Sequence, residues 1–364
     1  MRPRQQNGLS TAAVALVLGL TVVGCQGRPV ARVPRITGVL HAVAAVSSRD
    51  AWAVGQAGAY GCGCNQPLII HWNGSSWARV ASPDPGGGGH LSGIAFTSVG
   101  NGWAVGVTGH GTPLIIRWDG TGWTRVPSPR LPGPAELNGV AAVSARSAWA
   151  VGDIGGLASS RTLILRWNGT TWTRVPSPSP PGQTTLNGVA ASSGSRAWAV
   201  GIGGGSPLAE LWNGRTWTQV PTLAREGVLQ AVTAVSANAA WAVGYASGHH
   251  TRTLILRLDG TGWRLVPSPD PAGGCIGDVL SGVAASSPTS AWAVGGYACR
   301  PKTLIVRWDG SAWKQVPSLT PAGSNFLEAV ATTPVGHAWA VGSANGGTGT
   351  IFAVRWNGAS WQWR

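Results

Sequence analysis

The chain has 364 residues and is rich in Gly (55) and Trp (21), but it holds only two lysines, four glutamates and one methionine. This composition excludes a mainly helical protein, because each Gly costs about 1 kcal/mol in a helix and strong helix formers are scarce, whereas Val, Ile, Thr and Trp are typical of strands. The formal charge of +14 favours anionic partners, although 24 arginines against two lysines also suit a bias in genomic base composition.

Residues 1–24 are predicted to be a lipoprotein signal peptide. Arg2 and Arg4 form a basic start, residues 11–23 form a short apolar run, and the segment ends at Val22-Val23-Gly24-Cys25. This ending resembles a bacterial lipobox, which implies cleavage before Cys25, a lipid on that cysteine and anchoring to the outer face of the cell membrane. Plain secretion and a membrane span are the alternatives, but the run is shorter than the roughly 18 to 20 residues that a span needs. Removal of residues 1–24 lowers the formal charge to +12.

A repeated phrase decides the expected fold. "AWAVG" or a near copy recurs with its Trp at 52, 103, 149, 198, 241, 292 and 339, at intervals of 43 to 51 residues. Each unit holds four apolar segments, such as 137–144, 147–152, 162–167 and 172–176, bounded by Gly, Ser, Asn or Pro. An Asn-Gly or Asp-Gly pair joins the third and fourth segments, which is typical of a tight hairpin turn.

These features predict an all-β, seven-bladed β-propeller of four-stranded antiparallel blades, with a solenoid as the alternative. The expected blades cover residues 40–89, 90–136, 137–185, 186–228, 229–279, 280–326 and 327–364. Residues 25–39 are a tether, and 31–34 ("ARVP") compete with 361–364 for the outer strand of blade seven. The inner strands consist mostly of Gly, Ala, Val and Ser, as expected for strands that converge on a channel.

The phrase "AWAVG" followed by "TLILRWNGTTWTRVPSP" (162–178) resembles the kelch repeat in all seven units. Kelch repeats have two glycines after the second strand, and here only Gly295-Gly296 supplies both. The short turn between aromatic residues is also similar to the Asp-box hairpins of sialidase-type propellers. Both resemblances imply a propeller. Because the aromatic positions recur in the other copies, Trp167 and Trp172 are expected to pack within the blades rather than bind a ligand.

The loops between second and third strands and the blade connections are long and dissimilar, and they are expected on one face, which we call the loop-rich face. Variable loops on a rigid scaffold are typical of binding sites. The inner strands begin on the same face, and the residue after their leading Leu is polar and different in each unit. We predict that these residues form a channel-mouth ring, with solvated strand starts as the alternative: His41, Ser92, Asn138, Asn187, Gln230, Ser281 and Glu328.

Export would place the four later cysteines in an oxidising compartment. Cys275 and Cys299 lie on one face of blade six, so a disulfide between them is predicted. Cys62 with Cys64 in blade one is the remaining option for a second pair, with a metal site as the alternative. Cys-x-Cys without a second ligand pair is weak support for a metal, and we expect no metal, cofactor or nucleic-acid partner.

Arginines recur on two strands of the blades and suggest a basic outer wall. One set precedes the hairpin turn (Arg117, Arg166, Arg257, Arg307 and Arg355) and the other lies on the outer strand (Arg79, Arg125 and Arg174). Their stems either cover Trp side chains on a solvated strand face or meet an anionic surface.

The sequence favours a binding protein over an enzyme. It holds three tyrosines, places only Glu328 of the glutamates near the mouth, and shows neither a carboxylate pair for glycosidase chemistry nor a motif for copper radical oxidation. We therefore expect a monomeric, extracytoplasmic, lipid-anchored protein that binds glycan or protein through its loop-rich face. The alternatives are a hydrolase or lyase of envelope polysaccharide and a structural scaffold for a partner complex.

Overall fold

The four apolar segments of each repeat form four antiparallel strands, each bounded by turn residues. A computed structural model describes residues 36–58, 65–83, 85–156, 159–260, 262–271, 277–297, 302–321, 323–344 and 349–364. The predicted signal peptide, the predicted lipidation site Cys25 and most of the predicted tether lie outside these ranges. None of the described residues forms a helix that is long and apolar enough to cross a membrane.

The first two strands of each blade are the longer ones. The inner strands are β1 (Gly38–Ser47), β5 (Gly89–Ser98), β9 (Ala135–Ser144), β13 (Thr184–Ser193), β17 (Gly227–Ser236), β21 (Asp278–Ser287) and β25 (Asn325–Thr332). The second strands are β2 (Asp50–Ala57), β6 (Asn101–Thr108), β10 (Ser147–Ile154), β14 (Arg196–Gly203), β18 (Ala239–Ala246), β22 (Ser290–Tyr297) and β26 (Ala338–Ala344).

The outer half of each blade is the hairpin around the Asn-Gly or Asp-Gly turn. The third strands are β3 (Gln66–Trp72), β7 (Pro113–Trp118), β11 (Arg161–Trp167), β15 (Ser206–Trp212), β19 (Arg252–Asp259), β23 (Lys302–Trp308) and β27 (Ile351–Trp356). The outer strands are β4 (Trp77–Val80), β8 (Trp123–Arg125), β12 (Trp172–Val175), β16 (Trp217–Gln219), β20 (Trp263–Leu265), β24 (Trp313–Gln315) and β28 (Trp361–Trp363).

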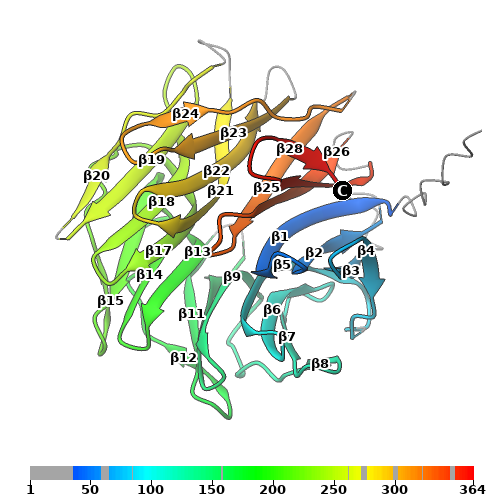
Figure 1. The fold of residues 1–364 in the computed structure, drawn as a ribbon. Coiled ribbons are helices and arrows are strands. Elements are labelled where there is room, and N and C mark those ends of the chain that lie inside the picture. Colours follow the sequence, from blue (N-terminus) through cyan, green and yellow to red (C-terminus); the bar gives the residue numbers. More distant parts are fainter. Residues whose placement is uncertain are drawn as a thin grey trace, which may run out of the picture. The chain divides into compact units, whose positions relative to one another are not determined.

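The strands form seven sheets, and each sheet contains four consecutive strands. Each inner strand packs beside those of the two neighbouring blades, and β1 lies beside both β5 and β25, so the sheets surround a centre (Figure 1). The prediction of an all-β, seven-bladed propeller with four antiparallel strands per blade is confirmed.

In every copy of "AWAVG" the glycine is required because a side chain there would clash with the backbone. The inner strand is irregular just after its Leu, as between Leu137 and Gly139 in blade three. At this irregularity the carbonyl oxygen of Glu136 comes so near Gly152 that a Cβ there would lie 1.9 Å from it. The other six copies show the same approach, at 1.9 to 2.0 Å, so no residue with a side chain fits.

The predicted hairpins between third and outer strands are present, but the turn differs from a two-residue turn. Trp167 pairs with Trp172, which leaves four residues in the loop. Of the Asn168-Gly169 pair only Gly169 takes a positive φ, 105°. The Asn168 side-chain oxygen instead accepts hydrogen bonds from the N–H groups of Thr170 and Thr171, both at 2.9 Å. The Asn therefore acts as a side-chain cap, a role that Asn and Asp perform in many turns.

Tryptophans fill the spaces between blades. Trp103 of blade two packs against Trp167 and Trp172 of blade three, with ring centroids 4.8 and 5.1 Å apart. The same group of three recurs between other blades, and Trp339 of blade seven packs against Trp72 and Trp77 of blade one. The repeated tryptophans are therefore packing residues, and the last group joins the two ends of the ring.

Backbone hydrogen bonds also close the ring. The residue that begins an inner strand donates to a carbonyl at the second-to-third loop of the preceding blade, as in Ala135 N to Gly111 O at 2.9 Å. Gly38 N donates in the same way to Gly349 O at 3.0 Å and so links blade one to blade seven. The outer strand of blade seven is β28, which pairs with β27. Of the two segments that compete for this place, the C-terminal one occupies it, and residues 31–34 lie outside the described ranges.

Candidate functional site

All seven residues of the channel-mouth ring lie together at the inner strands. They line a central cavity of about 200 Å³ with the Gly, Ala, Val and Ile residues that follow them. Neighbouring inner strands approach closely there, since a Cβ on Gly282 would lie 2.8 Å from the Cα of Ala329. The ring therefore surrounds a narrow channel rather than a wide basin, and its role in binding stays a prediction.

Part of the ring holds the blades together. The Asn138 amide donates to the carbonyl of Leu186 at 3.0 Å, and the Asn187 amide donates to the carbonyl of Leu229 at 2.9 Å. Each bond joins one blade to the next. These two asparagines thus have a structural task in addition to any contact with a ligand.

The channel disfavours the charged forms of the two titratable ring residues. Burial, and then the neighbouring His90, lower the pKa of His41 to about 4. Burial raises the pKa of Glu328 to about 7. His41 Nε2 is buried without a hydrogen-bond partner among the described residues. A narrow, poorly solvated channel accounts for both pKa shifts, because it disfavours charge of either sign.

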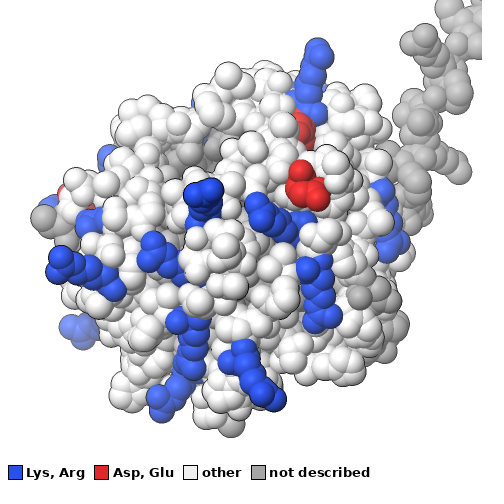
Figure 2. Space-filling model, turned by 90° about the horizontal axis from the view of Figure 1, so that it is seen from below, with Lys and Arg blue, Asp and Glu red and all other residues white. Residues whose placement is uncertain are grey.

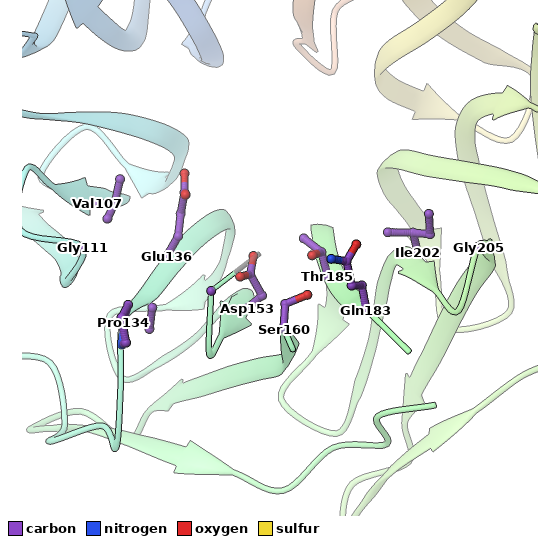
Figure 3. Close-up of a pocket in the computed structure, with 12 residues that line it drawn as sticks. Val107, Gly111, Pro134, Glu136, Asp153, Ser160, Gln183, Thr185, Ile202 and Gly205 are labelled. Atoms are coloured by element: carbon purple, nitrogen blue, oxygen red, sulfur yellow. The ribbon is translucent and has the colours of Figure 1, made fainter. Parts of the chain in front are cut away.

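A larger cavity opens on the loop-rich face beside the channel mouth. Its volume is about 430 Å³, and it extends over blades two, three and four (Figure 3). Its lining combines apolar and polar side chains: Val107, Pro134, Glu136, Asp153, Ser160, Gln183, Thr185 and Ile202. None of the described lining residues is Lys or Arg.

Glu136 and Asp153 form a carboxylate pair in this cavity. They lie directly opposite each other on the antiparallel strands β9 and β10. Side chains in such a pair lie on the same face of the sheet, and two like charges there repel. Burial, and then the charge of Glu136, raise the pKa of Asp153 to about 6, while side-chain hydrogen bonds with Asn138 and Thr185 act in the opposite direction.

A chain of polar contacts links the cavity to the channel. The His90 Nε2 lies 3.0 Å from the Glu136 Oε1, an interaction between β5 and β9. The His90 ring lies 5.7 Å from the His41 ring, measured between centroids. The four side chains His41, His90, Glu136 and Asp153 therefore form one polar group over blades one to three.

From the sequence, only Glu328 of the four glutamates was predicted near the channel mouth. In the structure Glu136 also lies near it, within hydrogen-bond distance of His90. Two positions of the repeat indicate in the sequence that blade three differs from the other six. The residue before the leading Leu is Val39, His90, Glu136, Thr185, Val228, Val279 or Phe326. The residue after the "AWAVG" Gly is Gln56, Val107, Asp153, Ile202, Tyr245, Gly296 or Ser343. Only in blade three are both acidic, but the direct pairing requires the irregular register of β9 against β10.

The two sets of predicted wall arginines have different environments. Arg117, Arg166, Arg257, Arg307 and Arg355 lie over Trp rings, as where the Arg166 guanidinium is 5.1 Å from Trp149 and 5.5 Å from Trp212. Arg79, Arg125 and Arg174 are exposed on the outer strands. In the first set all but Arg355, which lies over Trp339 of its own blade, contact rings of two neighbouring blades, whereas the second set is an open surface.

The predicted cysteine sites cannot be placed on this structure, because Cys62, Cys64, Cys275 and Cys299 lie outside the described residues. In the part of the chain that is described, no three His, Cys, Asp or Glu side chains gather in a group that could hold a metal ion.

Solved propellers share this fold at low sequence identity. YCF48 bound to D1 peptide is 16% identical, with a TM-score of 0.58 over 87% of this chain and 93% of that one. The β-propeller domain of Cps50 (Swd1) from Myceliophteria thermophila is 13% identical, with a TM-score of 0.58 over 89% and 97%. A mutant of Aleuria aurantia lectin, a six-bladed propeller, in complex with alpha-methyl-L-fucoside is 11% identical, with a TM-score of 0.51 over 90% and 94%. No protein-family model matches the chain, and no curated protein matches its sequence.

Proposed function

We propose that this chain is a binding protein that takes a glycan or protein ligand in the cavity over blades two to four. The cavity on the loop-rich face carries the proposal, because it is the place where residues that differ from blade to blade surround about 430 Å³. Binding sites are typically concave, mostly apolar and equipped with a few polar groups that orient the ligand. Val107, Pro134 and Ile202 supply the apolar part, and Glu136 with Asp153 supply the polar part.

The chemistry of the lining favours a ligand that donates hydrogen bonds. Ionised carboxylates only accept hydrogen bonds, so sugar hydroxyls or amide N–H groups complement Glu136 and Asp153. An anionic ligand would face both acids without a described Lys or Arg beside it. Neutral glycans therefore fit better than acidic ones at this site.

The structural relatives support a binding role by analogy alone. Their printed descriptions name a D1 peptide for YCF48 and a fucoside for the Aleuria aurantia lectin. Propellers thus bind a peptide in one case and a fucoside in another. For this chain the choice between them depends on the cavity.

The location is part of the proposal. We infer that the mature chain is anchored by lipid on Cys25 to the outer face of the cell membrane, on the strength of the resemblance to a lipobox at residues 22–25. Metabolic labelling with an alkyne fatty acid tests the anchor, and labelling of the Cys25→Ser chain equal to that of the natural chain would exclude it.

The binding test uses the detergent-solubilised full chain on arrays of glycans and of peptides. We expect a neutral glycan ligand whose binding falls at least about tenfold in Glu136→Gln and in Asp153→Asn, since each removes an ionised acceptor. Glu226→Gln is the matched control, because Glu226 is exposed and does not line the cavity. Equal loss in the control, or binding unaffected by both cavity variants, would contradict the assignment.

One observation favours hydrolysis of envelope polysaccharide as the second candidate. Glu136 and Asp153 are a carboxylate pair, and the pKa of Asp153 is raised to about 6, as a general acid requires. Release of reducing ends from a bound polysaccharide, lost in Asp153→Asn, would establish the enzyme. Prolonged incubation without product would favour the binding protein over the hydrolase. Capture of one stoichiometric protein partner without glycan binding would indicate a structural scaffold.

A further inference from the structure

Three exposed arginines occupy the same position on the outer wall of blades one, two and three. Arg79, Arg125 and Arg174 are each the third residue of their outer strand, two residues after a buried Trp. The equivalent residues of blades four to six are Gln219, Leu265 and Gln315. The cationic position is thus confined to three consecutive blades.

These arginines have no acidic partner among the described residues, in contrast to the cations on the other side of the ring. In blade five Arg264 lies 2.9 Å from Asp259, and in blade six Lys314 forms an ion pair with Asp309 at 2.6 Å. Arg252 lies 3.7 Å from Asp270. Three exposed cations of blades five and six are therefore neutralised within the protein.

The turn residues explain why blades one to three differ. Blades one and three have the neutral Asn73 and Asn168 where blades five and six have Asp259 and Asp309. Blade two has Asp119, whose carboxylate accepts hydrogen bonds from the N–H groups of Thr121 and Gly122. Thr124 stands there where blade six has Lys314, so no ion pair with Asp119 forms among the described residues. The side chain of Thr121 and those N–H groups lower the pKa of Asp119 to about 2.

The remaining described acids of blades one to three are engaged elsewhere, and of the two in blade four Glu210 is buried while Glu226 is exposed. Asp50 lies 2.9 Å from His71, Glu136 and Asp153 line the cavity, and Glu210 is fully buried. Figure 2 views the molecule from below the orientation of Figure 1, where β8 and β12 lie, and it shows many Lys and Arg side chains with few acidic ones. The outer wall of this side is cationic.

We propose that Arg79, Arg125 and Arg174 form a second binding surface, the basic wall, which holds a linear acidic polysaccharide. Guanidinium groups bind carboxylates in a bidentate way, and three of them at equivalent positions of a repeated scaffold match a polymer with repeated charges. The basic wall shares no residue with the cavity, so this inference stands apart from the proposed function.

The curvature of the wall favours a polymer over a bilayer. The three arginines follow one another around the outside of a ring, so a flat membrane would meet one blade edge while a flexible chain can contact all three. The wall also lacks the exposed aromatic rings on which bases of single-stranded nucleic acids stack, since the one exposed large aromatic among the described residues is Trp363 in blade seven. Repeated charge without base stacking is what an acidic polysaccharide offers.

The test measures binding of the detergent-solubilised full chain to polygalacturonate at several salt concentrations. The wall variant is Arg79→Gln with Arg125→Gln and Arg174→Gln, and the matched control is Arg252→Gln with Arg264→Gln and Lys314→Gln. Both remove three positive charges at exposed sites, so circular dichroism and the melting temperature should show that both keep the fold. We expect salt-dependent binding that falls at least about tenfold in the wall variant and less than about threefold in the control.

Equal losses in the two variants would show that net charge alone attracts the polymer and would overturn the proposal. Absence of binding to polygalacturonate at low salt would also overturn it. Vesicles of anionic phospholipid and single-stranded DNA serve as the other probes, and tighter wall-dependent binding to either would replace the polysaccharide by a membrane or a nucleic acid as the partner.

Discussion

Asp153 and Glu136 face each other across β9 and β10 as direct cross-strand partners, although neither strand offers a basic residue between them. Glu136 has a partner in His90 at 3.0 Å, whereas Asp153 has hydrogen bonds with the neutral side chains of Asn138 and Thr185. The proximity of two acids is unfavourable for folding. Strain of this kind is typical of functional sites, where stability is lost in favour of binding or catalysis.

Asp153→Asn is therefore expected to stabilise the fold at neutral pH. The folded-state pKa of about 6 lies above the ordinary 3.8, so the folded chain binds more protons between these values and its stability falls as the pH rises through them. The variant should remove this fall and increase the free energy of unfolding by on the order of 1 kcal/mol at pH 7. Urea unfolding midpoints at pH 4 and pH 7 measure it, and an unchanged pH dependence would contradict the buried pair.

Glu210 is a second acid whose replacement should stabilise the protein. It is fully buried in the third strand of blade four, and neither carboxyl oxygen has a hydrogen-bond partner among the described residues. The six equivalent residues are apolar and buried: Ile70, Ile116, Leu165, Leu256, Val306 and Val354. Burial raises the pKa of Glu210 to about 8, so the carboxyl is mainly neutral at pH 7.

Since this pKa is above the unfolded value of 4.5, the free energy of unfolding should fall by roughly 3 kcal/mol as the pH rises from 4.5 to 7. Glu210→Leu is expected to abolish that part of the pH dependence and to raise the midpoint of urea unfolding at pH 7. Glu226→Gln, at an exposed site, should change neither. If the Glu210→Leu chain is less stable than the natural one at pH 7, the buried carboxyl stabilises the fold and the prediction is wrong.

Arg166 and Arg174 should differ in their contribution to stability although they lie on neighbouring strands of the same hairpin. The Arg166 guanidinium lies over Trp149 and Trp212 and so connects blades three and four. Arg166→Gln is expected to cost about 1 kcal/mol, the usual value of a partly buried cation–π contact, while Arg174→Gln should cost less than about 0.5 kcal/mol. Denaturant midpoints of the two variants measure the difference, and equal midpoints would argue against the inter-blade role.

Gly152→Ala should prevent stable folding. Its Cβ would lie 1.9 Å from the carbonyl oxygen of Glu136, a backbone atom in a bonded sheet, so the strands would have to separate. We expect a loss of more than about 3 kcal/mol or insoluble protein. Gly122→Ala is the control, since a Cβ there meets no atom within 4 Å. Soluble Gly152→Ala protein with a natural melting temperature would mean that the close approach is absent.

Most of the fold could be predicted from sequence because its determinants are local and repeated. Strand length, turn residues and the small side chains of the inner strands occur in each of the seven copies, so an error in one unit is corrected by the others. The length of the turn at Asn168-Gly169 could not be predicted from the Asn-Gly pair. Its four-residue loop depends on side-chain hydrogen bonds that a dipeptide pattern does not reveal.

The sequence alone determined the number of blades, the strands within each blade and the location of the channel-mouth residues, since repetition defines equivalent positions. Only the tertiary structure decided that Glu136, Asp153 and His90 meet, because they come from different strands and their contact depends on the irregular register after Leu137. It also separated Arg166, which is packed over tryptophan, from Arg174, which is open to solvent. The burial and the charge environment of a residue depend on neighbours from other blades. The sequence of one blade does not show which residues those neighbours are.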